Sequence, residues 1–217
     1  MRVRKKKHGE QRIEAQKRYL CTDPGLIRGD INAPFGRVAP LRLEIGCGKG
    51  GFILGESSRL PDRNFYALEM ISDVMVTALE KYAAENRSAE TDNVRFIIAN
   101  AGNLEQYFTG PSFETIYINF CDPWPKAGHA KRRLVHRDFL KMYREIALPG
   151  GRLRFKTDNG GLFDFAEEEL ASCGMRTVFH TRDLHSSPMA RENVMTEYEA
   201  KFTEKGVRIC MLEAELS

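Results

Sequence analysis

Residues that could do chemistry gather at two places in this 217-residue chain. The first is the glycine-rich stretch EIGCGKGG, residues 44–51, which follows an apolar run. Glycines allow a tight turn there and let the backbone approach a ligand closely. The second is NFCDPWPK, residues 119–126, where two prolines restrict the loop around Asp122 and the only tryptophan of the chain. We expect the first stretch to hold a ligand and the second to present a rigid carboxylate.

The glycine loop alone is compatible with two ligand classes. Gly46, Gly48 and Gly51 have the GxGxxG spacing of dinucleotide-binding proteins. Glu69 ends the next apolar run, 23 residues after Gly46, where a carboxylate can accept both hydroxyls of a ribose. This pattern fits NAD as well as an adenosine-type ligand.

Glu44 favours the second class of ligand. A carboxylate beside the phosphates of a dinucleotide would repel them, whereas a ligand with ammonium and sulfonium groups tolerates it. S-adenosylmethionine is such a ligand. Asn100, which follows the third apolar run, could hydrogen-bond an adenine edge.

The loop around Asp122 has the chemistry of nucleic-acid recognition. A carboxylate suits the N1–H and 2-amino donors of guanine. Trp124 could stack on a base, although packing is the commoner role of a single tryptophan. Basic residues after the loop suit phosphates; they are Lys126, Lys131, Arg132 and Arg133.

The net charge of +3 conceals two basic segments on an acidic chain. Residues 1–18 and residues 126–144 each carry a net charge of +6, so the remainder carries −9. Local positive charge is what binding to a polyanion requires, and a solvated tail with a polar helix face is the alternative.

The pattern of elements predicts an α/β fold. Short β-branched and aromatic runs indicate seven strands, at residues 41–46, 64–69, 94–99, 115–120, 151–157, 175–182 and 207–216. Helical composition lies between them, at residues 52–60, 72–86, 101–108, 136–148 and 161–174, with Ser72 as a possible N-cap. The alternation predicts a Rossmann-like, mostly parallel seven-stranded sheet with helices on both faces. We expect a basic, mobile arm over residues 1–38 and one domain over residues 39–217, with ligands at the carboxyl ends of the strands.

The composition bears on disulfides, metal sites and cellular location. The five cysteines are widely spaced and form no CxxC pair, so we expect reduced thiols. The five histidines have no zinc-ligand spacing, which predicts no metal site. No apolar run is long enough for a membrane span and no signal peptide follows the basic start, so we expect a cytoplasmic protein, monomeric or homodimeric.

The segments LEIGCGKGGFI, INFCDPWPKAGHAKRRL, RFKTDNGGLF and MTEYEAKF together resemble the bacterial tRNA (guanine-N7)-methyltransferases over about residues 36–206. The resemblance implies the class I methyltransferase fold, S-adenosylmethionine as cofactor, S-adenosylhomocysteine as product, and tRNA as partner. The implied substrate is the guanosine at position 46 in the variable loop.

The resemblance also implies roles for individual residues. The implied cofactor residues are Glu44, Gly46, Gly48, Gly50, Glu69, Asn100 and Asp122, and Asp122 matches the proposed catalytic carboxylate between cofactor and guanine. The implied substrate residues are Lys126, Asp158, Thr196, Glu197, Tyr198 and Glu199. The RNA-contacting loop corresponds to Gly128, His129, Ala130, Lys131, Arg132 and Arg133. Position 100 is often Asp in the family, and the residue at position 197 varies.

Guanine N7 carries a lone pair and no proton, so its methylation needs no general base. We therefore expect catalysis by positioning and electrostatics, with Asp122 as an electrostatic partner and Cys121 as a packing residue. Two alternatives stay open. An NAD-dependent oxidoreductase would explain GxGxxG and Glu69 but not DPWPK, and a non-catalytic RNA-binding protein would use the basic segments alone.

Overall fold

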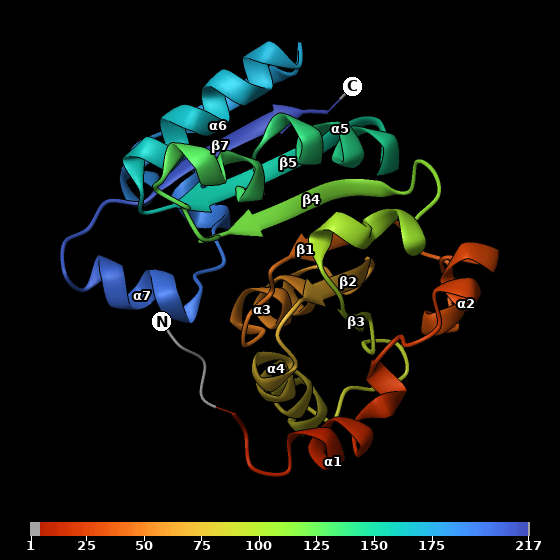
Figure 1. Ribbon diagram of the computed structural model, residues 1–217. Coiled ribbons are helices and arrows are strands. Elements are labelled where there is room, and N and C mark those ends of the chain that lie inside the picture. Colours follow the sequence, from red (N-terminus) through yellow and green to blue (C-terminus); the bar gives the residue numbers. More distant parts are fainter. Residues whose placement is uncertain (1–4, 217) are drawn as a thin grey trace. The chain divides into compact units, whose positions relative to one another are not determined.

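The computed structural model describes residues 5–216 and divides the chain into two compact units, residues 1–109 and 110–217 (Figure 1). The first unit contains three strands and the second contains four. Each unit is described by itself.

The first unit is built on three adjacent parallel strands, ordered β3-β2-β1. They are β1 (Leu41–Ile45), β2 (Asn64–Glu69) and β3 (Val94–Ile98). Leu43 pairs with Tyr66, and Tyr66 pairs with Arg95, so the strands end at the same edge. The glycine loop, Glu69 and Asn100 follow these three ends in turn.

Both faces of β2 are covered. Phe65 and Ala67 belong to a core cluster with α3 (Gly51–Arg59) and α4 (Ser72–Ala84). Tyr66 points to the other face, where its ring meets those of Phe35 and Phe108 at 5.0 and 5.2 Å. A strand buried on both faces reads as a continuous apolar run, which is the pattern of parallel sheets.

The segment before β1 contains four short helices: α1 (Gly9–Glu14), α2 (Pro24–Gly29), and the 3-10 helices η1 (Lys17–Tyr19) and η2 (Ala33–Phe35). Arg12 donates two hydrogen bonds to Glu80 of α4, each at 2.7 Å, and the Tyr19 ring meets the Tyr82 ring edge-on at 5.0 Å. This segment therefore packs on the first unit. Its mobility stays a prediction, and residues 1–4 lie outside the described residues.

The second unit contains four adjacent strands, ordered β4-β5-β7-β6. They are β4 (Phe113–Asn119), β5 (Ala147–Thr157), β6 (Arg176–Thr181) and β7 (Cys210–Glu215). β4 and β5 are parallel, with Asn119 opposite Lys156, whereas β7 is antiparallel to both β5 and β6. The carboxyl ends of β4 and β5 therefore place residues 120–126 and Asp158 at one edge.

Two long helices and several short ones complete the second unit. α5 (Arg137–Ile146) and α6 (Gly160–Ser172) contact each other and β5. α7 (Glu197–Thr203) lies near the carboxyl ends of β4 and β5 in Figure 1. The 3-10 helices are η4 (Ala127–Arg132), η5 (Leu184–Ser186) and η6 (Pro188–Glu192).

The predicted fold class is confirmed: the seven expected strands form, five of them in parallel pairings of a Rossmann-like α/β fold. Two local expectations were wrong. Ser72 is the first residue of α4 and not its N-cap, because Ile71 occupies that position and its carbonyl accepts the amides of Val74 and Met75. Residues 101–108 form a short 3-10 helix, η3 (Ala101–Gln106), with non-helical geometry at Asn103.

Candidate functional site

The glycine loop is fixed to the end of β2 by its own backbone. The amides of Gly46 and Cys47 both donate to the Leu68 carbonyl, at 2.8 and 3.0 Å. The amide of Gly48 donates to Oε2 of Glu69 at 3.2 Å, and Oε1 of Glu69 accepts the Ile71 amide at 2.8 Å. Glu69 is thereby oriented by two backbone donors before any ligand arrives.

Three of the four glycines in residues 44–51 need glycine's conformational freedom: Gly46, Gly48 and Gly50. All have left-handed φ, 79° for Gly46, 58° for Gly48 and 82° for Gly50, a region that L side chains rarely adopt. A Cβ on Gly46 or Gly48 would meet no atom within 4 Å, so the backbone borders open space. A Cβ on Gly50 would lie 2.9 Å from Cβ of Ala78. Gly46 and Gly48 therefore leave room for a ligand, whereas Gly50 lets the loop pack on α4.

Two carboxylates, Glu44 and Glu69, act on the glycine loop. Burial raises the pKa of the Cys47 thiol well above its usual value, and the carboxylates of Glu44 and Glu69 raise it further. Glu44 is 2% exposed, at the end of β1. Two carboxylates around one open glycine turn suit a cationic ligand and repel a diphosphate. These residues fit S-adenosylmethionine.

Asn100 lies at the end of β3, where it is exposed. Its Oδ1 caps η3 by accepting the Gly102 amide at 2.8 Å, and its Nδ2 donates to the Met70 sulfur at 3.3 Å. Met70, which follows Glu69 directly, is 59% exposed. Met70 was not among the predicted site residues; the available signal was its position directly after the ribose-type carboxylate, where an exposed apolar side chain is unexpected.

The Asp122 loop contains two strained residues. Phe120 and Trp124 have φ of 53° and 42°, although neither is glycine. Such conformations cost roughly 1–3 kcal/mol each and persist only where surrounding contacts enforce them. Asp122 lies midway between them and is exposed. The backbone is thus held in a costly shape that presents this carboxylate to solvent.

Arg133 helps to hold the backbone of the Asp122 loop in this conformation. Its guanidinium donates to the carbonyls of Pro123 and Trp124, at 3.0 and 3.1 Å, and lies 4.3 Å from the centroid of the Phe165 ring. Arg132 lies over the Trp124 ring at 4.9 Å, and His129 meets that ring edge-on at 5.7 Å. Trp124 is therefore packed within the loop, and Arg133 is engaged with protein atoms.

The remaining residues of the predicted RNA-contacting loop lie on η4. Lys126 is its exposed N-cap, and Gly128, Lys131 and Arg132 are also exposed. Ala130 is partly buried and its carbonyl accepts the Arg133 amide at 3.0 Å. The N-cap and the helix therefore offer three exposed cations shortly after Asp122 in the chain: Lys126, Lys131 and Arg132.

Cys121 directly precedes the exposed Asp122 and is itself partly buried. Burial raises the pKa of its thiol to about 12, and the neighbouring charge of Asp122 contributes in the same direction. A thiol with this pKa stays protonated near neutral pH and is a poor nucleophile. The packing role of Cys121 stays a prediction.

Asp158 and Tyr198 meet at the end of β5. Oη of Tyr198 donates to Oδ2 of Asp158 at 3.3 Å. The Tyr198 ring stacks on Phe202 at 4.3 Å and contacts Phe120, which begins the Asp122 loop, at 5.0 Å. Tyr198 is 43% exposed. The structure thus brings together two predicted substrate residues, Asp158 after β5 and Tyr198 on α7, and packs Tyr198 against Phe120 at the start of the Asp122 loop.

Thr196 and Glu199 form a capping box at the start of α7. Thr196 Oγ1 accepts the Glu199 amide at 2.9 Å, and the Glu199 carboxylate accepts the Thr196 amide at 3.3 Å. The Glu199 side chain is fully buried, whereas Glu197 is exposed. The Thr-x-x-Glu spacing is a known helix-start signature that the sequence analysis did not use.

Two further features concern the setting of the site. Within residues 5–216, no group of three or more His, Cys, Asp or Glu side chains could hold a metal ion, and all five cysteines are free. None of the helices in this range combines the length and the apolar character needed to cross a membrane.

Comparison with solved structures identifies the fold. The chain superposes on a structure titled "Crystal Structure of 16S rRNA Methyltranferase KamB" with a TM-score of 0.64 at 15% identity, covering 87% of this chain and 93% of that one. A structure titled "Structure of an Antibiotic Related Methyltransferase" gives 0.63 at 16% identity, covering 86% and 92%. The shared fold is that of the methyltransferases.

Residues 38–212 match the family model Methyltransf_4, described as "Putative methyltransferase". Relatives from Lysinibacillus sphaericus and Geobacillus thermodenitrificans, both named tRNA (guanine-N(7)-)-methyltransferase, are 40% and 41% identical; each alignment covers 99% of this chain, and 98% and 97% of the relatives. The chain therefore belongs to the tRNA (guanine-N(7)-)-methyltransferase family.

Proposed function

We propose that the protein transfers a methyl group from S-adenosylmethionine to N7 of a guanosine in tRNA, at position 46 of the variable loop. The observation that carries this proposal is the open glycine turn of the first unit, flanked by Glu44 and by the pre-oriented Glu69. The near full-length relatives support the choice of tRNA guanine as substrate.

The residues proposed to bind the cofactor lie at the ends of β1, β2 and β3, and each has a different role in binding. Gly46 and Gly48 give the ligand room, Glu44 and Glu69 supply negative charge, and Glu69 is placed to accept ribose hydroxyls. Asn100 and Met70 form the edge on which an adenine would rest. S-adenosylmethionine, when bound, supplies an electrophilic methyl group on a sulfonium.

Asp122 acts on the guanine. Its exposed carboxylate can accept the N1–H and 2-amino hydrogens, which orients the ring and leaves N7 free as the nucleophile. The same negative charge stabilises the positive charge that develops on the methylated ring. No proton leaves N7, so no side chain acts as a base.

The exposed cations Lys126, Lys131 and Arg132 are proposed to bind phosphates near the target nucleoside. Asp158 and Tyr198 are proposed to bind the nucleoside itself, since they are partly exposed and joined to the Asp122 loop through Phe120. A tRNA substrate also favours the cytoplasmic location expected from the sequence.

The decisive experiment incubates the purified protein with unmodified tRNA and methyl-labelled S-adenosylmethionine, followed by nucleoside mass spectrometry. We expect N7-methylguanosine, and none in a tRNA whose variable-loop guanosine is replaced. Label in another nucleoside would overturn the substrate assignment. Cofactor binding without transfer would favour a non-catalytic RNA-binding protein, and binding of NADH in place of S-adenosylhomocysteine would favour an oxidoreductase.

A further inference from the structure

Lys156 carries a buried charge that none of the assigned roles uses. It is the penultimate residue of β5, and its side chain is 4% exposed. Its Nζ donates to Oε2 of Glu199 at 2.7 Å, to Oδ1 of Asn193 at 2.9 Å and to the Val194 carbonyl at 3.0 Å. One ammonium thus fastens the chain from Asn193 to the start of α7 onto the end of β5.

The same residue also holds the start of the Asp122 loop. The Lys156 carbonyl accepts the Phe120 amide at 2.9 Å, where Phe120 has its left-handed φ. Nζ of Lys156 lies 5.9 Å from the centroid of the Phe120 ring, which in turn contacts Tyr198 at 5.0 Å. Lys156 therefore contacts both segments that present the proposed substrate residues.

Glu199 completes the cluster from the α7 side. Its Oε1 accepts from Nδ2 of Asn193 at 2.7 Å and lies 3.2 Å from Nε2 of His185. A fully buried carboxylate cannot reach RNA, so it affects substrate only through the segment that it holds. A buried ion pair is weak evidence for stability, because desolvation of the two charges offsets their attraction, whereas removing one partner leaves an uncompensated buried charge.

We propose that Lys156, paired with Glu199, is a positioning residue that sets the Asp122 loop and the Asp158–Tyr198 pair in register for binding and methylation of the guanosine. This inference rests on the proposed function. It assigns no contact between Lys156 and the RNA.

The test compares Lys156→Met with Arg154→Met. Arg154 lies two residues earlier on β5 and pairs with Glu213 of β7 at 2.6 Å, without contact to Phe120 or to residues 193–199 in any of its described bonds. For Lys156→Met we expect kcat/KM for tRNA to fall at least tenfold, with affinity for S-adenosylhomocysteine within twofold of wild type. For Arg154→Met we expect both quantities within twofold. Equal kinetic losses in the two variants would overturn the proposal.

Two measurements need no substrate. They test the positioning role of Lys156 even if the proposed function is wrong. Trp124, the only tryptophan, reports the Asp122 loop, and we expect acrylamide to quench it more strongly in Lys156→Met than in Arg154→Met. Trypsin should cut faster at the exposed Arg191 and Lys201, which flank the fastened segment. Unchanged quenching and cleavage would contradict the positioning role even if wild-type protein methylates another nucleoside.

A double variant tests whether lost stability alone explains the loss of activity in Lys156→Met. Lys156→Met/Glu199→Gln removes the isolated buried carboxylate that the single variant leaves, so its melting temperature should rise relative to Lys156→Met. We expect kcat/KM to stay at least tenfold below wild type, because the segments are no longer fastened, and Lys156→Arg to recover part of it. Recovery of activity in parallel with melting temperature would show a merely structural role.

Discussion

The Gly48 amide donates a hydrogen bond to the Glu69 carboxylate at 3.2 Å, so the turn after β1 and the end of β2 form one preassembled unit. Glu69 retains acceptor capacity for a ligand because a carboxylate offers about four lone-pair sites. The cofactor side of the site is thus set by backbone geometry as much as by side chains.

Alanine substitutions at two glycines of this turn should have different effects. Each costs about 1–2 kcal/mol for its left-handed φ. Gly50→Ala adds a 2.9 Å contact with Ala78, worth roughly 1–3 kcal/mol of overpacking, and should lower the melting temperature more. Gly48→Ala should instead weaken S-adenosylhomocysteine binding more than Gly50→Ala does, as measured by calorimetry at a temperature where both are folded. The reverse order would contradict the assignment of Gly48 to the ligand.

Asp122→Asn should remove most methyl transfer at every pH tested, because the amide lacks the negative charge and cannot accept both guanine hydrogens. The melting temperature should change little, since Asp122 is exposed. The measurement is kcat across about pH 6 to 9. Activity that returns as the pH rises would indicate a proton-transfer role instead.

Cys121→Ser should retain activity and reduce the sensitivity of the fold to base. Burial raises the thiol pKa to about 12, above the ordinary value of about 8.5 that applies in the unfolded chain. The folded state then binds more protons than the unfolded state between these values, so stability is intact below about pH 8.5 and falls as pH rises toward 12. Urea unfolding at a series of pH values should show a shallower fall for the serine variant. A steeper fall would contradict burial of this thiol.

The roles of Arg132 and Arg133 should differ in how each residue affects the salt dependence of tRNA binding. Arg132→Ala should weaken tRNA binding and reduce the slope of log affinity against log salt by about one, as expected for a lost phosphate contact. Arg133→Ala should leave that slope unchanged but lower kcat, because Arg133 holds the carbonyls of Pro123 and Trp124. Filter binding at several salt concentrations checks both. A reduced slope for Arg133→Ala would restore it as an RNA contact.

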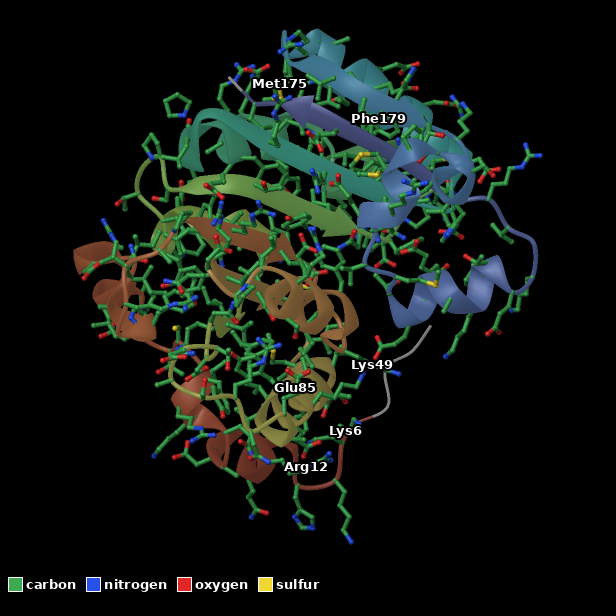
Figure 2. The ribbon with its side chains drawn as sticks, turned by 180° about the vertical axis from the view of Figure 1, so that it is seen from behind. Lys6, Arg12, Lys49, Glu85, Met175 and Phe179 are labelled. Carbon is green, nitrogen blue, oxygen red and sulfur yellow. The ribbon has the colours of Figure 1, made fainter. Side chains whose placement is uncertain are left out.

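The basic N-terminal segment can be tested without disturbing the core. Lys5, Lys6 and His8 line a cavity of about 330 Å³ beside Ser72 and Asp73, and Figure 2 shows Lys6 and Lys49 projecting from the same side of the first unit. Replacing Lys5, Lys6 and Lys7 with Gln should weaken tRNA binding and flatten its salt dependence, with cofactor affinity unchanged. Removal of residues 1–38 is a poorer test, since it also deletes Tyr19, which packs on Tyr82. Unaltered RNA affinity of the triple variant would exclude this segment from the interface.

The strands were predictable because each is a short apolar run, and the positions that follow their carboxyl ends were predictable for the same reason. Glu69 and Asp122 illustrate this, since strand order alone places them at a ligand-binding edge. The resemblance added specific roles that spacing could not supply.

What the sequence could not provide is the partner of each charge. Arg133 and Lys131 are equivalent cations in a sequence, yet one binds carbonyls of the neighbouring loop and the other is exposed. Glu199 likewise resembles a surface carboxylate until the strand carrying Lys156 is brought against it. Such roles depend on which distant residues a charged side chain pairs with, and the periodicity of the sequence does not reveal those pairs.

Glu44, Glu69 and Asn100, which are proposed to bind the methyl donor, precede residue 110, whereas Asp158 and Tyr198, which are proposed to bind the guanosine, follow it. Mutations that alter nucleic-acid preference can therefore accumulate in one half of the gene without endangering use of the donor. Related enzymes can therefore come to methylate different nucleosides while they keep the same methyl donor.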